Sequence, residues 1–193
     1  MDERQIIPAD HILPNKLLII SLMGNPIFPG IFTPFMIALQ DDINVINRSM
    51  STDNLIGLLL FKTDEPDKST GPKELYEVGT VAKIVKRINL PDGGMNIFIS
   101  TLKRFRVKKF LSAEPPITAA VEYLDDVYDD TDEVKALTRS LISEMKQISE
   151  NNPLFSEEMR LNMVNIDHPG KIADFITSIL NVGRHEQQRI LET

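Results

Sequence analysis

Adjacent carboxylates are the side chains of this chain with the clearest potential for acid–base chemistry. Such pairs include Asp41-Asp42, Asp125-Asp126, Asp129-Asp130 and Glu157-Glu158. General acid–base catalysis needs a carboxylate whose pKa is tuned by burial or by a charged partner. These pairs stand at expected helix starts or in an acidic connector, where negative charge is favourable or simply hydrated. We therefore interpret them as solvated acids and not as a catalytic pair.

The other motifs that carry catalytic chemistry are missing from the sequence. There is no Gly-x-x-x-x-Gly-Lys-Ser/Thr phosphate loop, no Gly-x-Gly-x-x-Gly turn and no Gly-x-Ser-x-Gly nucleophile elbow. The chain has no cysteine, which excludes disulfides, thiolate metal sites and a cysteine nucleophile. Its three histidines, His11, His168 and His185, lie far apart with no partner at metal-ligand spacing. We predict no catalytic residue, metal site or cofactor site in this chain.

Basic residues are concentrated in one stretch of a chain whose net charge is −7. Between Lys83 and Lys109 eight basic residues accompany one acid, Asp92. Alternation with apolar residues predicts a strand with one basic and one buried face. One interpretation is that this basic face pairs with acidic groups of the helical part or of a neighbouring subunit. The alternative is that it is a docking surface, either for nucleic acid through weak DNA contact or for an oligomer partner. Its residues are Lys83, Arg87, Arg104, Arg106 and Lys108.

A third candidate is the apolar, proline-rich segment of residues 26–37, with the sequence Pro-Ile-Phe-Pro-Gly-Ile-Phe-Thr-Pro-Phe-Met-Ile. Proline fixes φ and lacks an N–H, which confines such a segment to turns, extended structure or a sheet edge. The segment either caps the end of a core or presents adaptable apolar surface to another polypeptide. The predicted contact residues are Phe28, Ile31, Phe32, Phe35 and Met36. If all are buried, the alternative is Met145, Met159 and Met163 of the helical part.

The residues up to about 125 carry the signals of strands. The apolar runs at 17–22 and 55–61 are typical of strands covered on both faces. A turn at Pro91-Asp92-Gly93-Gly94 predicts a hairpin, and Asp41-Asp42 opens one short helix. Six strands are expected in all, at 17–22, 32–39, 55–61, 78–90, 95–111 and 117–123. We predict a compact antiparallel sheet, either barrel-like or in two layers.

After residue 125 the apolar period changes from strand to helix. An amphipathic helix ending at Asn151, a second starting at Ser156 and a third opened by Asp167 and Pro169 are expected. Gly183 is expected to end the third helix in a left-handed conformation, before a fourth that starts at Arg184. The predicted fold class is therefore α+β, with a β-rich lobe at 1–125 and an α-helical bundle lobe at 126–193.

Length and composition bound the class of protein. A chain of 193 residues, 42% apolar and 25% charged, is typical of a globular protein with a sizeable core. Its apolar runs of about seven residues are far shorter than the ~20 that a membrane span needs. The start, Met-Asp-Glu-Arg, leads into no signal-like apolar region. We expect a cytoplasmic protein.

Five motifs in order resemble the amino-terminal domain of ATP-dependent Lon proteases. They are Ile20-Ser21-Leu22 with Phe28-Pro29 and Pro34, Leu75-Tyr76-Glu77-Val78-Gly79-Thr80-Val81-Ala82-Lys83-Ile84, Leu90-Pro91-Asp92-Gly93, Phe105-Arg106-Val107, and Pro169-Gly170-Lys171-Ile172-Ala173-Asp174-Phe175-Ile176. The resemblance runs from about residue 12 to the end. It departs at residues 20–24, Ile-Ser-Leu-Met-Gly, where the family commonly has Leu-Pro-Leu-Arg-Asp.

The resemblance implies a parent protein that is a homo-hexameric, ATP-driven serine endopeptidase of the bacterial cytoplasm or mitochondrial matrix. Such enzymes degrade misfolded and short-lived regulatory proteins, as in the response to stress. Their ATPase module, which uses ATP and Mg, and their Ser-Lys protease module would follow residue 193. The chain is therefore expected to be a truncated substrate-recognition and assembly domain, which binds unfolded or degron-bearing polypeptides and does not cut them.

Overall fold

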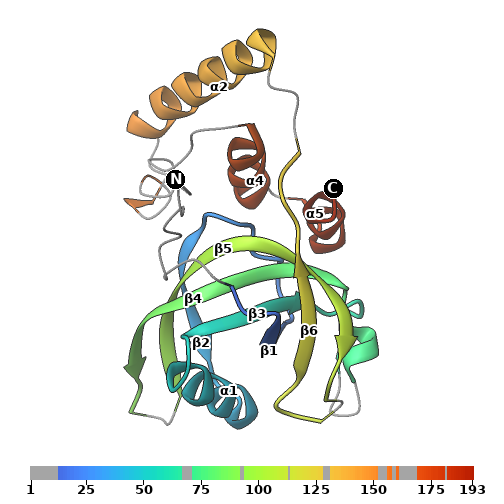
Figure 1. Ribbon diagram of the computed structural model, residues 1–193. Coiled ribbons are helices and arrows are strands. Elements are labelled where there is room, and N and C mark those ends of the chain that lie inside the picture. Colours follow the sequence, from blue (N-terminus) through green and yellow to red (C-terminus); the bar gives the residue numbers. More distant parts are fainter. Residues whose placement is uncertain are drawn as a thin grey trace, which may run out of the picture.

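The computed structural model describes residues 13–66, 71–91, 94–112, 114–127, 131–151, 156–157, 160, 169–180 and 182–193. Its strands are β1 (Lys16–Leu22), β2 (Phe32–Ile37), β3 (Leu55–Leu60), β4 (Val78–Asn89), β5 (Met95–Phe110) and β6 (Thr118–Tyr123). Its helices are α1 (Gln40–Met50), the short 3-10 helix η2 (Pro72–Glu74), α2 (Asp132–Asn151), α4 (Pro169–Ile179) and α5 (Arg184–Leu191). The six strands form one sheet in the order β2-β5-β4-β3-β1-β6. Because β5 also pairs with β6, the sheet closes on itself (Figure 1).

The central strands β1 and β3 are buried on both faces, as their continuous apolar runs predict. On one face Ile20 and Ile56 pack in a cluster that includes Ile46 of α1. On the other face Leu17 and Leu59 pack in a cluster around Phe105 and Val107 of β5. Burial of both faces explains why these strands show no alternation of apolar and polar residues.

The sheet is mixed, which corrects the prediction of an antiparallel sheet. β1 and β3 are parallel, with Ile19 opposite Gly57 and Leu22 opposite Leu60, whereas the other pairs are antiparallel. Parallel neighbours need a crossover connection, and here residues 23–54 supply it through β2 and α1. The lengths of the strands were predictable from the sequence, but the order in which they pair was not.

The long strand β5 organises the sheet. Its first half pairs with β2, its second half with β6, and both halves pair with β4 across the predicted hairpin. The Leu90 N–H donates to the Gly94 carbonyl at 2.9 Å at the base of the hairpin turn, and Asp92 and Gly93 lie outside the described residues. Irregular registers near Lys86 and Val107 mark β-bulges, which bend a strand and allow closure.

The helices lie at the two ends of the sheet. In Figure 1, α1 covers the lower end, α4 and α5 lie above the upper end, and α2 is the most distant from the strands. The residues expected to form the helix after Ser156 lie mostly outside the described ranges, so the four-helix bundle lobe stays a prediction. Within the described part of the chain, no helix is long and apolar enough to cross a membrane.

Gly183 corrects a second expectation. Its φ of −61° and ψ of 146° are those of extended backbone, and it immediately precedes α5 as the N-cap residue. The expected left-handed stop of the preceding helix is therefore not present at this glycine. The next helix begins directly after it, so the glycine serves the start of α5.

Gly79 generates a test of the sheet. A Cβ at this position would lie 2.1 Å from the backbone oxygen of Leu58 and 2.6 Å from Leu59 Cδ2. Because backbone in a central sheet cannot move away cheaply, we expect Gly79→Ala to lower the free energy of unfolding by about 2 kcal/mol or more, measured by urea denaturation. Gly24→Ala is the matched control, since its Cβ would meet no atom within 4 Å. Equal stabilities of the two variants would contradict the packing described here.

Candidate functional site

The proline-rich segment forms a turn that hydrogen bonds hold against strand β5. Gly30 has a φ of 77°, a conformation that favours glycine, and its N–H donates to the Thr101 carbonyl at 3.0 Å. The hydroxyl of Thr101 accepts a hydrogen bond from the Ile31 N–H at 2.8 Å and lies 2.7 Å from the Phe28 carbonyl, to which it donates. Thr101 itself is buried on β5. One buried hydroxyl therefore holds both sides of the turn.

Phe28 closes a small core between the sheet and α5. Its side chain is fully buried against Val78 of β4 and Leu191 of α5, with Ile31 packed at the edge of this cluster. The segment therefore does cap a core, which is one of the two roles expected for it.

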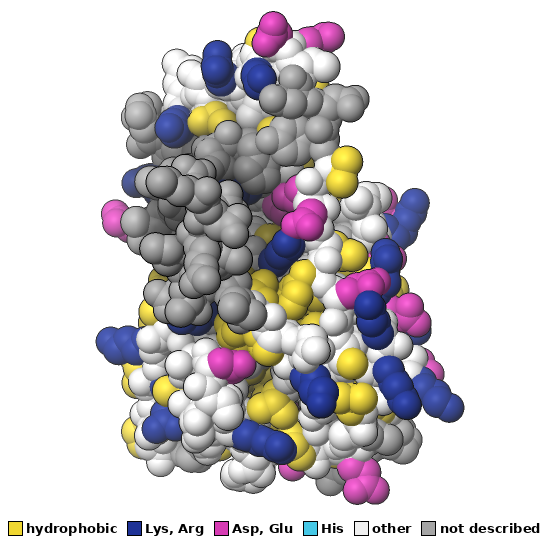
Figure 2. Space-filling view, in the orientation of Figure 1, with side chains coloured by type: hydrophobic (Ala, Val, Ile, Leu, Met, Phe, Trp, Pro, Cys, Tyr) yellow, Lys and Arg dark blue, Asp and Glu magenta, His cyan; other side chains and the backbone are white. Residues whose placement is uncertain are grey.

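A groove runs between the same segment and α4. It has a volume of about 430 Å³, and its walls include Pro26, Ile27, Ile31, Pro34 and Phe35 on one side and Phe175 and Ile179 on the other. Figure 2 shows hydrophobic side chains in the middle of this face, with Lys, Arg, Asp and Glu side chains both among them and toward the margins. The segment thus also supplies the apolar surface expected of its second role.

The five predicted contact residues occupy different positions around this groove. Ile31 and Phe35 line it and are half-buried, and Phe28 also belongs to the lining although its side chain is fully buried. Phe32 stacks on Phe98 with ring centroids 6.0 Å apart. Met36 is 69% exposed on β2 but is not part of the described lining. Contact of these residues with a substrate stays a prediction.

The second wall of the groove was not predicted from the sequence. Phe175 and Ile179 were identified as part of the apolar stripe of α4, and such a stripe is equally typical of a helix that faces only a core. Phe175 is buried, and Ile179 is half-buried beside Ser178 at the groove. The signal in the sequence that could have revealed this wall was the breadth of the apolar stripe. A stripe wider than one packing face allows residues at its edge to face a second neighbour. Of the alternative methionines, Met145 is half-buried on α2, and Met159 and Met163 lie outside the described residues.

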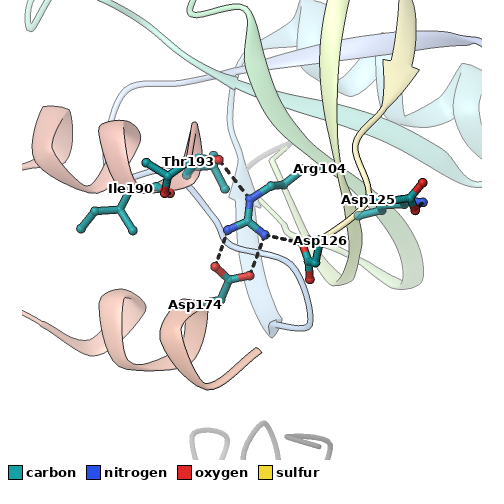
Figure 3. A network of polar contacts seen from close by, with 8 residues as sticks. Arg104, Asp125, Asp126, Asp174, Ile190 and Thr193 are labelled. Carbon is teal, nitrogen blue, oxygen red and sulfur yellow. Dashed lines mark hydrogen bonds and ion pairs between the residues drawn. The ribbon is translucent and has the colours of Figure 1, made fainter. Parts of the chain in front are cut away.

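Arg104 joins the sheet to the helices that form this wall. Its guanidinium makes a two-pronged ion pair with the carboxylate of Asp174 on α4, with Nη1 2.9 Å from Oδ2 (Figure 3). Nε donates to the Leu191 carbonyl in the last turn of α5 at 3.0 Å, and Nη1 lies 3.4 Å from Asp126. Only 4% of the Asp174 side chain and 12% of the Arg104 side chain are exposed. This network positions α4, and with it Phe175 and Ile179.

Other members of the basic face are also engaged with polar groups. Lys108 pairs with Glu122 at 2.9 Å, and Arg87 donates to the Asn47 side chain of α1 at 2.7 Å. Lys83 and Arg106 are exposed on β4 and β5. For Arg104, the ion pair with α4 agrees with pairing to acidic groups of the helical part. Contact of the remaining basic face with nucleic acid stays a prediction.

The amino-terminal end of α5 is held on the sheet by a second polar cluster. Arg184 donates to the Phe61 carbonyl at 2.9 Å and also bonds the carbonyls of Met23 and Thr63. His185 Nδ1 lies 3.0 Å from the Tyr76 hydroxyl, and Nε2 lies 3.1 Å from Asp64. These contacts give His185 a structural role. No three His, Asp or Glu side chains within the described ranges gather in a way that could hold a metal ion.

The structure superposes on the "N terminal domain of Mycobacterium avium complex Lon protease" with a TM-score of 0.64, covering 92% of this chain and 90% of that one at 16% identity. It also matches the Lon N-terminal domain protein from Xanthomonas campestris with a TM-score of 0.52, covering 86% of this chain and 98% of that one at 18% identity. At these identities the likeness establishes the fold, which is that of Lon amino-terminal domains.

Sequence relatives establish the family. Residues 16–193 match the model of the ATP-dependent protease La (LON) substrate-binding domain. The chain is 58% identical to the Lon protease of Treponema pallidum over 98% of its length, and 38% identical to that of Leptospira interrogans over 100%. The chain belongs to the family of Lon substrate-binding domains, which confirms the resemblance seen in its motifs. It spans 21% and 23% of the length of these two relatives.

The buried ion pair generates a test of how the groove is held. Removing the charge of one partner leaves the other charge buried and uncompensated, which costs about 3 kcal/mol. We therefore expect Asp174→Asn to lower the free energy of unfolding by about that amount in urea denaturation. Glu122→Gln breaks the exposed pair with Lys108 and is the control, with an expected change below about 1 kcal/mol. Equal effects of the two substitutions would show that Arg104 does not fasten α4.

Proposed function

We propose that this domain captures unfolded or degron-bearing segments of polypeptides for a Lon-type protease, in the groove between residues 26–35 and α4. The observation that carries the proposal is the two-sided apolar lining of this groove in a member of the Lon substrate-binding family. Segments that a folded protein keeps in its core would gain from burial against Ile31, Phe35 and Ile179. A folded protein hides such segments and would be ignored.

The construction of the groove suits a binder of many sequences. Its lining is mainly aliphatic and aromatic, with the hydroxyl-bearing residues Thr33, Ser156 and Ser178 among them, and the described lining contains no charged residue. Recognition would therefore depend on apolar area and not on a fixed pattern of hydrogen bonds, as in other promiscuous sites. Phe28 and Thr101 fix the turn beneath it, so the apolar surface is offered without collapsing into the core.

We infer that cutting and ATP use belong to other parts of the protein. The sequence has no Gly-x-x-x-x-Gly-Lys-Ser/Thr phosphate-binding loop and no Gly-x-Ser-x-Gly nucleophile elbow. The whole protein is inferred to be a homo-hexameric, ATP-dependent serine endopeptidase of the cytoplasm that degrades misfolded and short-lived regulatory proteins. Several domains on one ring would raise the effective concentration of binding sites, so weak binding at each would suffice.

The proposal is tested by binding of a permanently unfolded protein. We expect the domain to bind fluorescently labelled, reduced and carboxymethylated α-lactalbumin in an anisotropy titration, and to ignore the native, disulfide-bonded form. Phe35→Ser and Ile179→Ser should each weaken this binding about tenfold, because each removes an apolar anchor from one wall.

The matched control is Val85→Ser, which alters a residue that is 57% exposed on β4 and does not line the groove. Urea denaturation of each variant verifies that it is folded. Full-strength binding by both groove variants, or equal binding of native and unfolded lactalbumin, would refute the proposed site.

A further inference from the structure

A second and larger groove lies along β1. Its volume is about 870 Å³, and its apolar walls come from β1, the start of α1, the end of β3 and the turn before β6. The residues that form these walls include Ile19, Met23, Leu39, Val45, Phe61 and Ile117. None of them lines the groove beside α4, so the two sites are separate.

The floor of this groove contains a strand edge that no strand among the described residues covers. β1 pairs with β6 only through Lys16, Leu17 and Leu18, and the Ile19 N–H makes the last contact on that side, to the Ile117 carbonyl at 2.9 Å. The N–H and C=O groups of consecutive residues point to opposite edges of a strand, so Ser21, two residues after Ile19, faces the same edge as Ile19. No described residue continues the sheet beside Ser21, since Pro115 and Pro116 precede β6.

One wall of the groove carries a carboxylate that no described residue neutralises. Asp42 is half-buried in the first turn of α1 and lines the groove together with Asp41. Burial, and to a smaller extent the charge of Asp41, raises the pKa of Asp42 to about 6, above its usual value of 3.8. The described lining residues from β1, β3, the segment at Pro66 and the turn at Pro116 include no charged side chain that faces it.

We propose that this groove binds an extended, apolar polypeptide segment that adds a strand beside Ser21 and directs a lysine or arginine side chain toward Asp42. A free strand edge supplies main-chain hydrogen bonds to an incoming strand, and the flanking groove selects its side chains. The apolar walls fit the aliphatic side chains of such a segment, and the unneutralised acids fit one cation among them.

The inference rests on the proposed function in one respect, that the ligand is unfolded polypeptide. It adds a defined class of segment, apolar with an embedded basic residue, and a second point of attachment. Two separate grooves on one domain would hold one long unfolded chain more tightly than either groove alone.

The test uses short fluorescent peptides in which valine and threonine alternate around one central residue. We expect the peptide with a central lysine to bind the domain about tenfold more tightly than the peptide with norleucine. The peptide with glutamate should bind more weakly than the norleucine peptide. A lysine peptide with a methylated backbone nitrogen at the pairing position should also bind about tenfold more weakly. That comparison is independent of the folding of any variant, because only the ligand is changed.

Protein variants locate the site. In the Asp42→Asn variant, the lysine and norleucine peptides should bind with equal affinity. We expect this variant to fold, because the folded state already disfavours the ionised form of the Asp42 carboxyl. The ¹⁵N amide resonance of Ser21 should shift on binding. Phe35→Ser, on the other groove, should leave the preference for lysine over norleucine unchanged. If Phe35→Ser abolishes it while Asp42→Asn does not, the peptide occupies the groove beside α4, which supports the proposed function and overturns this inference.

The pH dependence gives a separate readout. Asp42 is ionised above about pH 6 and neutral below it, so its attraction for lysine is present at pH 7.5 and lost at pH 5. The preference for lysine over norleucine should therefore fall by about tenfold between these two pH values, and should not change in Asp42→Asn. A preference that is the same at both pH values, or no effect of backbone methylation, would overturn the inference.

Discussion

The ion pair between Arg104 and Asp174 connects the two parts of this domain. It crosses from the second half of β5 to α4, and the same guanidinium holds the last turn of α5 through the Leu191 carbonyl. Because both side chains are largely removed from water, each charge needs the other to offset its lost hydration. Moving α4 away from the sheet would therefore break this ion pair. The position of α4 in turn decides whether the proline-rich segment faces solvent or a second apolar wall.

The proline-rich segment resolves a conflict between stability and recognition. Apolar side chains that bind other polypeptides are at risk of collapsing into their own core. Here Phe28 is committed to the core, and the Gly30 turn and Thr101 hold its neighbours at the surface. The backbone is thereby fixed before any ligand arrives, so binding would not have to order it.

The second groove results from the same topology. β6 reaches only the first residues of β1, and the crossover through β2 and α1 that makes β1 and β3 parallel places the acids of α1 beside the remaining edge. The two grooves therefore use different devices. One offers apolar area between a turn and a helix, and the other offers a strand edge with a carboxylate.

The sequence by itself determined the local elements, because the spacing of apolar residues that distinguishes a strand from a helix involves only residues close together in the chain. The six strands, the helix after Asp41-Asp42, the hairpin around residues 91–94 and the family motifs were all predictable in this way. Tertiary structure alone decided that β1 and β3 are parallel, that Arg104 meets Asp174, and that Ile179 faces Phe35 across a groove. These contacts join residues that are distant in the chain, and a single sequence holds no local signal for which distant residues will pack together.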